Sequence, residues 1–365
     1  MILLILLIFL LSIILVKPVF VKQPLQSYNY LSRERTCCIN GIFIWLVFIG
    51  HLNHYPINLL EAEKSLNAEI CQLSQLVVTT FFLYSGYGIM HSLMNKGKRY
   101  AKSLLFRRFP RLLGLFASIV LLYWLIESLI GRSYTISHVL ISLTGFYTLE
   151  NSGWFIFITL LSYLEISVVY LCFEKFGNTI VCLIIASIMC IQMPIFKSSI
   201  MNDTLLCIPA GMLLCTYRKR IDYYVSQLPI HSSILGALLA ITGRYVYYFN
   251  ALLMMPPEHS SAALILYYLV DNFGSIMFAV GVTWFFAALT FKQAPSFLLW
   301  SGGSALFYIY ILQRIPMMLG VYWGVNYSHP TLYNTACMLI TILLAFVFVF
   351  VPRYAAKIAK QRLKA

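Results

Sequence analysis

The chain has 365 residues, of which 61% are hydrophobic and only 10% are charged. Soluble domains carry roughly 25% charged residues, so this composition excludes a water-soluble globular fold. The apolar residues form continuous blocks of about 20 residues, the length that a helix needs to cross a hydrocarbon layer of roughly 30 Å. The sequence therefore predicts an integral membrane protein.

In chain order, the apolar blocks and their polar breaks predict eleven transmembrane helices. They lie near residues 2–20, 39–57, 73–94, 112–131, 154–173, 178–195, 204–217, 230–249, 262–290, 297–325 and 331–351. The stretch from Ile136 to Leu149 is apolar but short, which favours an interfacial or re-entrant helix. The predicted fold class is all-α, a polytopic helical bundle of about eleven spans.

The chain is predicted to hold one membrane domain, residues 33–352, because no soluble linker interrupts the spans. Residues 1–32 would form an N-terminal transmembrane helix and its connector, and residues 353–365 a basic tail. The first apolar block could also be a cleaved signal sequence. It has neither a basic residue before it nor a small-x-small site after it, so we expect a retained helix.

The distribution of Lys and Arg predicts the orientation in the membrane. With the N-terminus outside, the inward loops and the C-terminal tail hold 21 of the 26 basic residues. The five on the outward half are Lys64, Arg132, Lys197, Arg244 and Arg314. The protein is therefore expected in the cell membrane as a multi-pass protein with a cytoplasmic C-terminus. The net charge of +14 is explained by topology, and no nucleic-acid partner is expected.

The strongest local signal is the basic segment from Lys96 to Arg111, KGKRYAKSLLFRRFPR. Positive-inside bias and attraction to anionic lipids explain such a segment in general terms. The spacing of Arg108 and Arg111 at a helix start suggests a phosphate-binding site, because two guanidinium groups on one side of a helix can each bind phosphate bidentately. Arg107 and Lys102 add charge beside them. The segment predicts a cytoplasmic site for a phosphate-bearing ligand.

A second signal is His51, which follows an apolar run of ten residues and so lies deep in a span. Counting from Cys37 at about 1.5 Å per residue places it roughly 20 Å from the cytoplasmic edge. An ionisable residue at that depth is a functional-site candidate. The alternative is a neutral histidine hydrogen-bonded between helices. His54 lies nearer the outer surface.

Four more charges are predicted in the outer half of the membrane, near the level of His51. They are Arg314, Glu127, Asp271 and Arg244. Unpaired charges there are costly, so they should either pair or line a wet cavity. Two interpretations stay open: the four charges line a polar acceptor pocket that opens outward, or they form two structural ion pairs.

Taken together, these elements resemble the membrane acyltransferase-3 family, which acylates sugars, lipids and surface polysaccharides. The resemblance covers about residues 33–352, a ten-span core to which the helix at 2–20 is added. The family has five motifs that this chain matches. They are an Arg followed by a Gly and a His, a Phe-Phe-x-x-Ser-Gly-Tyr element, an Arg-x-x-Arg, a Trp, and a late Gly-x-x-Ser-x-x-x-Tyr element. The matching residues are Arg35, Gly41, His51, Phe81, Phe82, Ser85, Gly86, Tyr87, Arg108, Arg111, Trp154, Ser304 and Tyr308. The Ser-Gly-Tyr element also fits simple close packing of helices.

The chain departs from the family pattern at two positions. Gln313 stands where members often carry a His, and Thr159 stands where many carry an acid. These departures affect the acceptor more than the reaction class.

The resemblance implies an integral membrane acyltransferase, similar to O-acetyltransferases. An acyl group, acetyl by resemblance, would pass from cytoplasmic acyl-CoA to a hydroxyl of an extracytoplasmic saccharide or glycoconjugate. Arg108 and Arg111 would bind the phosphates of the donor. His51 would act as general base, for which a pKa near 6.5 is suited, or carry the acyl group itself.

A different functional class also fits many spans and buried charges: a flippase, polymerase or transporter of a lipid-linked saccharide. Such proteins have less need of an inner Arg-x-x-Arg set against a deep His. The expected partners are membrane lipids, acyl-CoA and the acceptor. Acyl-CoA would be a co-substrate, and no tightly bound cofactor and no metal site are expected, because the nine cysteines lack metal-ligand spacing.

Overall fold

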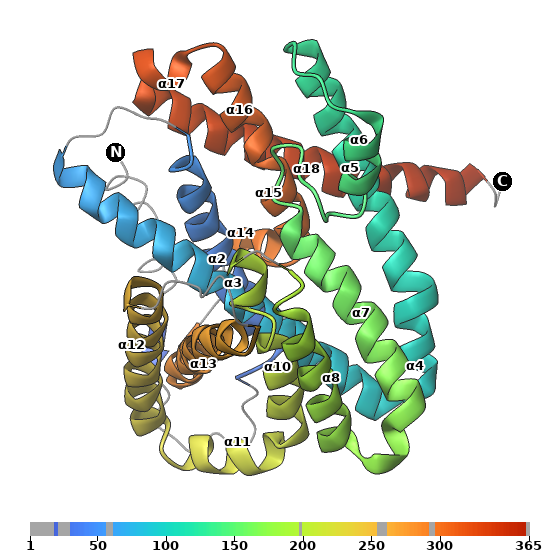
Figure 1. Ribbon diagram of the computed structural model, residues 1–365, viewed down its shortest axis with the longest axis vertical. Coiled ribbons are helices and arrows are strands. Elements are labelled where there is room, and N and C mark those ends of the chain that lie inside the picture. The colour runs from blue at the N-terminus through green and yellow to red at the C-terminus, as the bar shows by residue number, and fades with distance from the viewer. Residues whose placement is uncertain are drawn as a thin grey trace.

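The computed structural model describes residues 18–20, 30–55, 61–196, 199–253, 261–291 and 296–362. This part of the chain is almost entirely helical (Figure 1), which confirms the all-α fold class. The long helices are α2 (Arg33–Leu52), α3 (Glu61–Lys96), α5 (Phe109–Leu129), α7 (Trp154–Phe173), α12 (Pro229–Leu253), α13 (Ser261–Phe285) and α18 (Pro330–Arg362).

Shorter helices connect the long ones. They are α4 (Lys98–Ser103), the π-helix η1 (Leu104–Arg108), α6 (Ile136–Ser142), η2 (Glu174–Phe176), α8 (Asn178–Gln192), α9 (Ser199–Asn202), α10 (Cys207–Thr216), α11 (Arg218–Gln227), η3 (Phe286–Ala288), α14 (Ser296–Ser301), α15 (Leu306–Leu312), α16 (Arg314–Tyr322) and α17 (Val325–Ser328). Two three-residue strands, β1 (Pro18–Phe20) and β2 (Leu289–Phe291), pair antiparallel, with Val19 opposite Thr290.

Six helical segments of the described chain are long and apolar enough to cross a membrane. They are Arg33–Leu52, Ala68–Lys96, Lys98–Leu129, Trp154–Phe176, Ser261–Phe285 and Pro330–Pro352. Helices α11 and α12 form a bent pair that could be one more span, while α8, α10 and the segment Leu306–Tyr322 are shorter apolar helices. Every predicted span between residues 39 and 351 thus has a helical counterpart, and the count of eleven stays a prediction.

Two sequence predictions differ from the structure. The predicted span at 297–325 is not one helix but three, α14, α15 and α16, with a turn at residues 302–305. Of the predicted helix at 2–20, residues 2–17 lie outside the described chain, and residues 18–20 form strand β1 instead. Hydropathy finds apolar length, but it does not detect a turn or a strand pairing inside an apolar block.

The outer surface of the bundle is apolar, as lipid contact requires. On α18, Leu339, Leu343, Phe346 and Phe350 are all at least 40% exposed and recur at helical spacing along one side. In a bilayer such a stripe faces acyl chains at no hydrophobic cost. These exposed residues are therefore consistent with a membrane protein and do not indicate a protein interface.

Helices come closest where glycines remove side chains from the contact. A Cβ on Gly41 of α2 would overlap the backbone of Leu298 in α14, and one on Gly302 would overlap the backbone of Cys37 and Gly41. Small residues allow this approach of helix backbones in membranes. The contact holds the start of the three-part segment α14–α16 against α2.

The loops alternate between two ends of the molecule. In Figure 1 the lower end holds α11 and the turn from α7 to α8, while α16, α17 and the end of α5 lie at the upper end. The basic turn Arg218–Arg220 begins α11, so it lies at the lower end. The C-terminal end of α18 does not lie at the lower end with α11, so the alternation predicted from the basic residues stays a prediction.

Candidate active site

Helix α2 carries His51 in its last turn and is itself buried along most of its length. The side chain of Ser32 caps its start by accepting a hydrogen bond from the backbone N–H of Arg35, at 3.4 Å. Near its end, Gly50 packs against Ser74 of α3. His51 is therefore presented from a fixed helix between α3 and the segment α14–α16.

Three segments far apart in the sequence meet at His51: its own turn to His54, the segment before α7 at Ser152, and the stretch from Tyr310 to Arg314. Its Nε2 lies 3.5 Å from the hydroxyl oxygen of Ser152, which precedes α7. The ring of Tyr310, from α15, lies 6.0 Å from the imidazole, and that of His54 lies 5.7 Å away. Arg314, the first residue of α16, places Nη2 3.4 Å from Nδ1 of His54. Burial, followed by the charge of Arg314, lowers the pKa of His54, which keeps this ring neutral and able to accept from the guanidinium.

Several polar atoms around His51 are buried and complete no hydrogen bond with the described chain. They are Nδ1 of His51, both amide atoms of Asn151, the hydroxyl of Tyr310, Oε1 of Gln313 and Nε of Arg314. Nearly all buried polar groups in folded proteins have partners, so a local concentration of unpaired ones calls for an explanation. Groups of a polar ligand that enters beside His51 would satisfy them.

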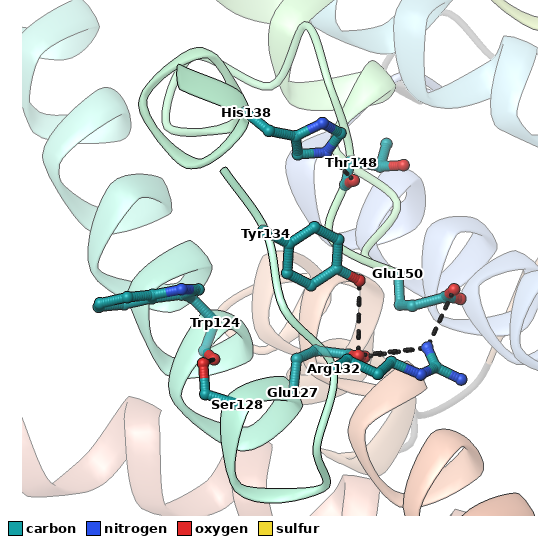
Figure 2. Close-up of polar contacts among 8 residues, drawn as sticks. All are labelled: Trp124, Glu127, Ser128, Arg132, Tyr134, His138, Thr148 and Glu150. Atoms are coloured by element: carbon teal, nitrogen blue, oxygen red, sulfur yellow. Dashed lines mark hydrogen bonds and ion pairs between the residues drawn. The ribbon is translucent and has the colours of Figure 1, made fainter. Parts of the chain in front are cut away.

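An ion network joins the end of α5 to Glu150, which lies two residues before Ser152 in the chain (Figure 2). Nη1 of Arg132 lies 3.2 Å from a carboxylate oxygen of Glu127 and 3.2 Å from one of Glu150. The hydroxyl of Tyr134 also donates to Glu127, at 3.4 Å. The Glu127 side chain is fully buried, so Arg132 supplies the countercharge that its burial requires. The network ties the end of α5 to the segment that carries Ser152.

A cationic pocket lies where the C-terminal end of α3 meets α4 and η1. Its volume is about 860 Å³. The lining residues are Asn95, Lys96, Arg99, Tyr100, Lys102, Ser103, Phe106, Arg107 and Arg108. Five of these nine are basic, and the guanidinium of Arg108 lies over the Tyr100 ring, 4.9 Å from its centroid. Arg107 and Arg108 belong to the π-helix η1, a form that occurs often at functional sites.

The pocket lies at the C-terminal end of α3, and His51 lies beside the first half of that helix. Ser74 of α3 contacts the turn of α2 next to His51, and Asn95 of α3 lines the pocket. Ser74 and Asn95 are 21 positions apart, which corresponds to about 30 Å of helix, close to the thickness of a bilayer core. The molecule therefore pairs a cationic pocket at one membrane face with a histidine site near the other.

Comparison with known proteins decides the family. The acyltransferase-3 family model, described as an acyltransferase domain, matches residues 38–350. The chain belongs to this family. No curated protein and no solved structure shows significant similarity to the chain. Membership of the acyltransferase-3 family confirms the resemblance drawn from the motifs, and with the apolar helices it makes the protein a membrane acyltransferase.

The structure brings some of the predicted acyltransferase-3 site residues together and separates others. Arg314 lies at the His51 site, and Glu127 belongs to the adjoining ion network. Asp271 lies on α13, where it accepts a hydrogen bond of 2.7 Å from the amide of Asn250. Arg244 pairs with Glu69. The four charges therefore pair with other residues and not with one another, and only two of them are near His51.

In the basic segment Lys96–Arg111, Lys102, Arg107 and Arg108 line the cationic pocket. Arg111 is exposed one turn further along α5 and is not among the lining residues. Arg111 is therefore placed to extend the positive field of the pocket more than to hold a ligand inside it.

The remaining motif residues of the family pack the scaffold. A Cβ on Gly86, beside Ser85, would overlap the carbonyl of Ile208, so this element lets α3 and α10 approach closely. Arg35 donates to the carbonyl of Phe286, at 3.4 Å. Trp154 packs on Phe82, Tyr308 packs on Phe348, and Ser304 is half-buried in the turn before α15.

Ser152, Tyr310, Asn151 and the Arg132–Glu150 pair were not predicted as site residues. Ser152 lies two residues before the motif residue Trp154, and Tyr310 two residues after Tyr308. Proximity to family motifs was the one sequence signal that could have pointed to them.

Proposed function

We propose that this membrane acyltransferase transfers an acyl group, acetyl in the simplest case, from cytoplasmic acyl-CoA to a hydroxyl of an extracytoplasmic saccharide or glycoconjugate. The observation that carries the proposal is the pairing of the cationic pocket with the histidine site about 30 Å away along α3. A donor with several phosphates would need a cationic pocket, and an acceptor with hydroxyls would need a base such as a histidine.

The donor side is supported by charge and volume. Acyl-CoA carries phosphates on its nucleotide and an uncharged arm that ends in the thioester. Five basic residues around about 860 Å³ match the phosphates, because guanidinium and ammonium groups bind phosphate through charge-assisted hydrogen bonds. The acyl-bearing arm would run between the helices toward His51.

The acceptor side is supported by the unpaired polar atoms around His51. An acceptor hydroxyl that approaches Nε2 would lose its proton to the imidazole as its oxygen attacks the acyl carbon. The amide of Gln313 and the guanidinium of Arg314 offer partners for further hydroxyls of a saccharide. Family membership favours group transfer over the alternative, transport of a lipid-linked saccharide. Comparing the masses of surface glycans with and without the gene would identify the acceptor.

Removing a pocket arginine should weaken donor binding. We expect Arg107→Ala or Arg108→Ala to reduce CoA affinity about ten- to a hundredfold, because one charge-assisted contact contributes about 1.5–3 kcal/mol. Arg108→Lys should recover part of this loss, since an ammonium offers a point charge and not a planar fork. Arg111→Ala should have a smaller effect. Binding of CoA to the purified protein in detergent measures all four variants.

The matched control for this prediction is Arg220→Ala, which removes an exposed arginine of α11 on the same predicted membrane face. It should leave CoA affinity unchanged. If both pocket variants bind CoA as tightly as the wild type, the basic segment has only a topological role.

The proposed orientation places the pocket and the C-terminal tail in the cytoplasm and the N-terminus outside. In a cysteine-free background, Lys98→Cys and Gln361→Cys should therefore resist a membrane-impermeant thiol reagent added to intact cells. Ser137→Cys, on the exposed outer helix α6, should react and serves as the positive control. Labelling of Lys98→Cys in intact cells would contradict the orientation.

A further inference from the structure

The segment that carries Ser152 is held in a strained conformation. Glu150 has φ of 58°, and it is the one non-glycine residue of the described chain with a positive φ. Such backbone strain costs of order 1–3 kcal/mol, and it persists where surrounding contacts impose it, often at active sites. Here the flanking residues Leu149, Asn151 and Ser152 are buried, and Glu150 itself pairs with Arg132 at 3.2 Å (Figure 2). The strained residue fixes the path of the chain into Asn151, Ser152 and Gly153.

That path presents the Ser152 hydroxyl to His51. Ser152 is 3% exposed, and its Oγ lies 3.5 Å from Nε2 of the imidazole. A serine hydroxyl next to a histidine nitrogen is the usual arrangement of a nucleophile and its base, and the contact is often longer before substrate binds. The position is also two residues before the start of α7, where the positive end of the helix dipole favours a developing alkoxide.

Hydrogen-bond donors for the carbonyl oxygen of a reacting acyl group lie in the same place. The Tyr310 ring lies 6.0 Å from the His51 imidazole, and neither its hydroxyl nor Nε of Arg314 completes a hydrogen bond within the described chain. The amide nitrogen of Asn151, adjacent in the chain to Ser152, is likewise buried and unpaired. Donors set in advance around a carbonyl oxygen stabilise the negative charge that it gains during acyl transfer.

We propose that Ser152 carries the acyl group as an ester between the two halves of the reaction, with His51 as the base in both. This inference rests on the proposed function and adds a covalent step to it. In the first half, Ser152 Oγ transfers its proton to Nε2 and attacks the thioester carbon. The carbon–sulfur bond breaks, and CoA leaves as the thiol after taking the proton from the imidazolium.

In the second half, the acceptor hydroxyl gives its proton to Nε2, and its oxygen attacks the ester carbon of acylated Ser152. The bond between that carbon and Oγ breaks, and the imidazolium returns the proton to Oγ. The net reaction joins the acyl group to the acceptor and regenerates both side chains, so it needs no further reactant.

A covalent relay suits an enzyme whose two substrates come from opposite sides of a membrane. Direct transfer requires the donor arm and the acceptor to occupy the site together, with paths open to both faces. An acyl-serine lets CoA leave toward the cytoplasm before the acceptor enters from outside. The same pair of residues then serves each half-reaction in turn.

The experiment incubates the purified full-length protein with radiolabelled acetyl-CoA and no acceptor, then traps it in acid and maps the labelled peptide. We expect about one acetyl group per chain on Ser152, and rapid release of one CoA before acceptor is added. Ser152→Ala should retain no label and transfer at least a hundredfold more slowly, while still binding CoA. Ser152→Cys should carry a thioester that hydroxylamine removes. Ser128→Ala, an exposed serine at the outer end of α5 (Figure 2), should label like the wild type.

A role of Ser152 in orienting His51 alone predicts a different result. The wild type would then take no label on serine, and Ser152→Ala would keep transfer within about tenfold of the wild type; either result overturns the relay. Label found on His51 overturns it as well. Neither outcome affects the proposed function, which fails only if the wild type neither binds acetyl-CoA nor acylates surface glycans. Retained CoA binding by Ser152→Ala shows that this variant is folded.

Discussion

Replacing His51 by glutamine is expected to reduce acyl transfer by about 10²–10⁴-fold, the contribution of a well-placed general base. Glutamine keeps a side chain of similar length that can still hydrogen-bond Ser152, but it cannot take a proton. Folding should therefore be preserved, and so should CoA binding, because the cationic pocket lies about 30 Å away along α3. Acyl transfer, yield in detergent and CoA affinity are measured side by side.

A structural histidine would behave in the opposite way. His51→Ala would then lower the yield of folded protein by leaving a buried partner unpaired, at a cost of about 1–3 kcal/mol. His51→Gln would restore both yield and activity. Substantial turnover by His51→Gln would therefore contradict the assignment of His51 as general base.

The helical architecture could be predicted because a bilayer imposes its own length on the sequence. An apolar block of about 20 residues has few alternatives to a helix, since every backbone group must be satisfied within the segment. This is why the spans near 39–57, 73–94 and 154–173 have long helices as counterparts. The same signal did not detect the break after α14, because the Gly302-Gly303-Ser304 turn is small and lies within an apolar block.

The candidate site was only partly predictable, and the reason is the kind of residue involved. His51 and Arg108 are ionisable groups in positions where charge is costly or concentrated, so they are conspicuous in a sequence. Ser152 and Tyr310 are neutral, and residues of these types are common in helical membrane proteins. Ser152 lies 101 positions from His51 in the sequence, so only the fold reveals that they meet.

Depth alone also could not pair the buried charges. Counting residues along a span predicts how far a charge lies from the membrane surface, but not the direction in which it points around the helix axis. Arg244 and Asp271 were predicted at the level of His51, yet Arg244 pairs with Glu69 and Asp271 with Asn250. Glu127 forms its ion pair with Arg132, which lies five positions later in the chain.

Gly302→Ala should both destabilise the protein and lower its activity, because Gly302 lies at the contact between α2 and the start of α14–α16. A Cβ at position 302 would overlap the carbonyl oxygen of Cys37 and the backbone of Gly41. These are backbone atoms of α2, so no side-chain rotation relieves the overlap, and α14 would have to move away. Such overpacking typically costs about 1–3 kcal/mol.

Activity should fall with stability, because α15 follows directly and carries Tyr310, whose ring lies 6.0 Å from that of His51. The matched control is Gly88→Ala on the exposed side of α3, where an added Cβ meets nothing within 4 Å. In a helix this exchange is neutral or stabilising by about 0.5–1 kcal/mol. Melting temperature in detergent and acyl transfer should therefore fall for Gly302→Ala and hold for Gly88→Ala. Equal behaviour of the two variants would mean that the close contact at Gly302 does not position Tyr310 against His51.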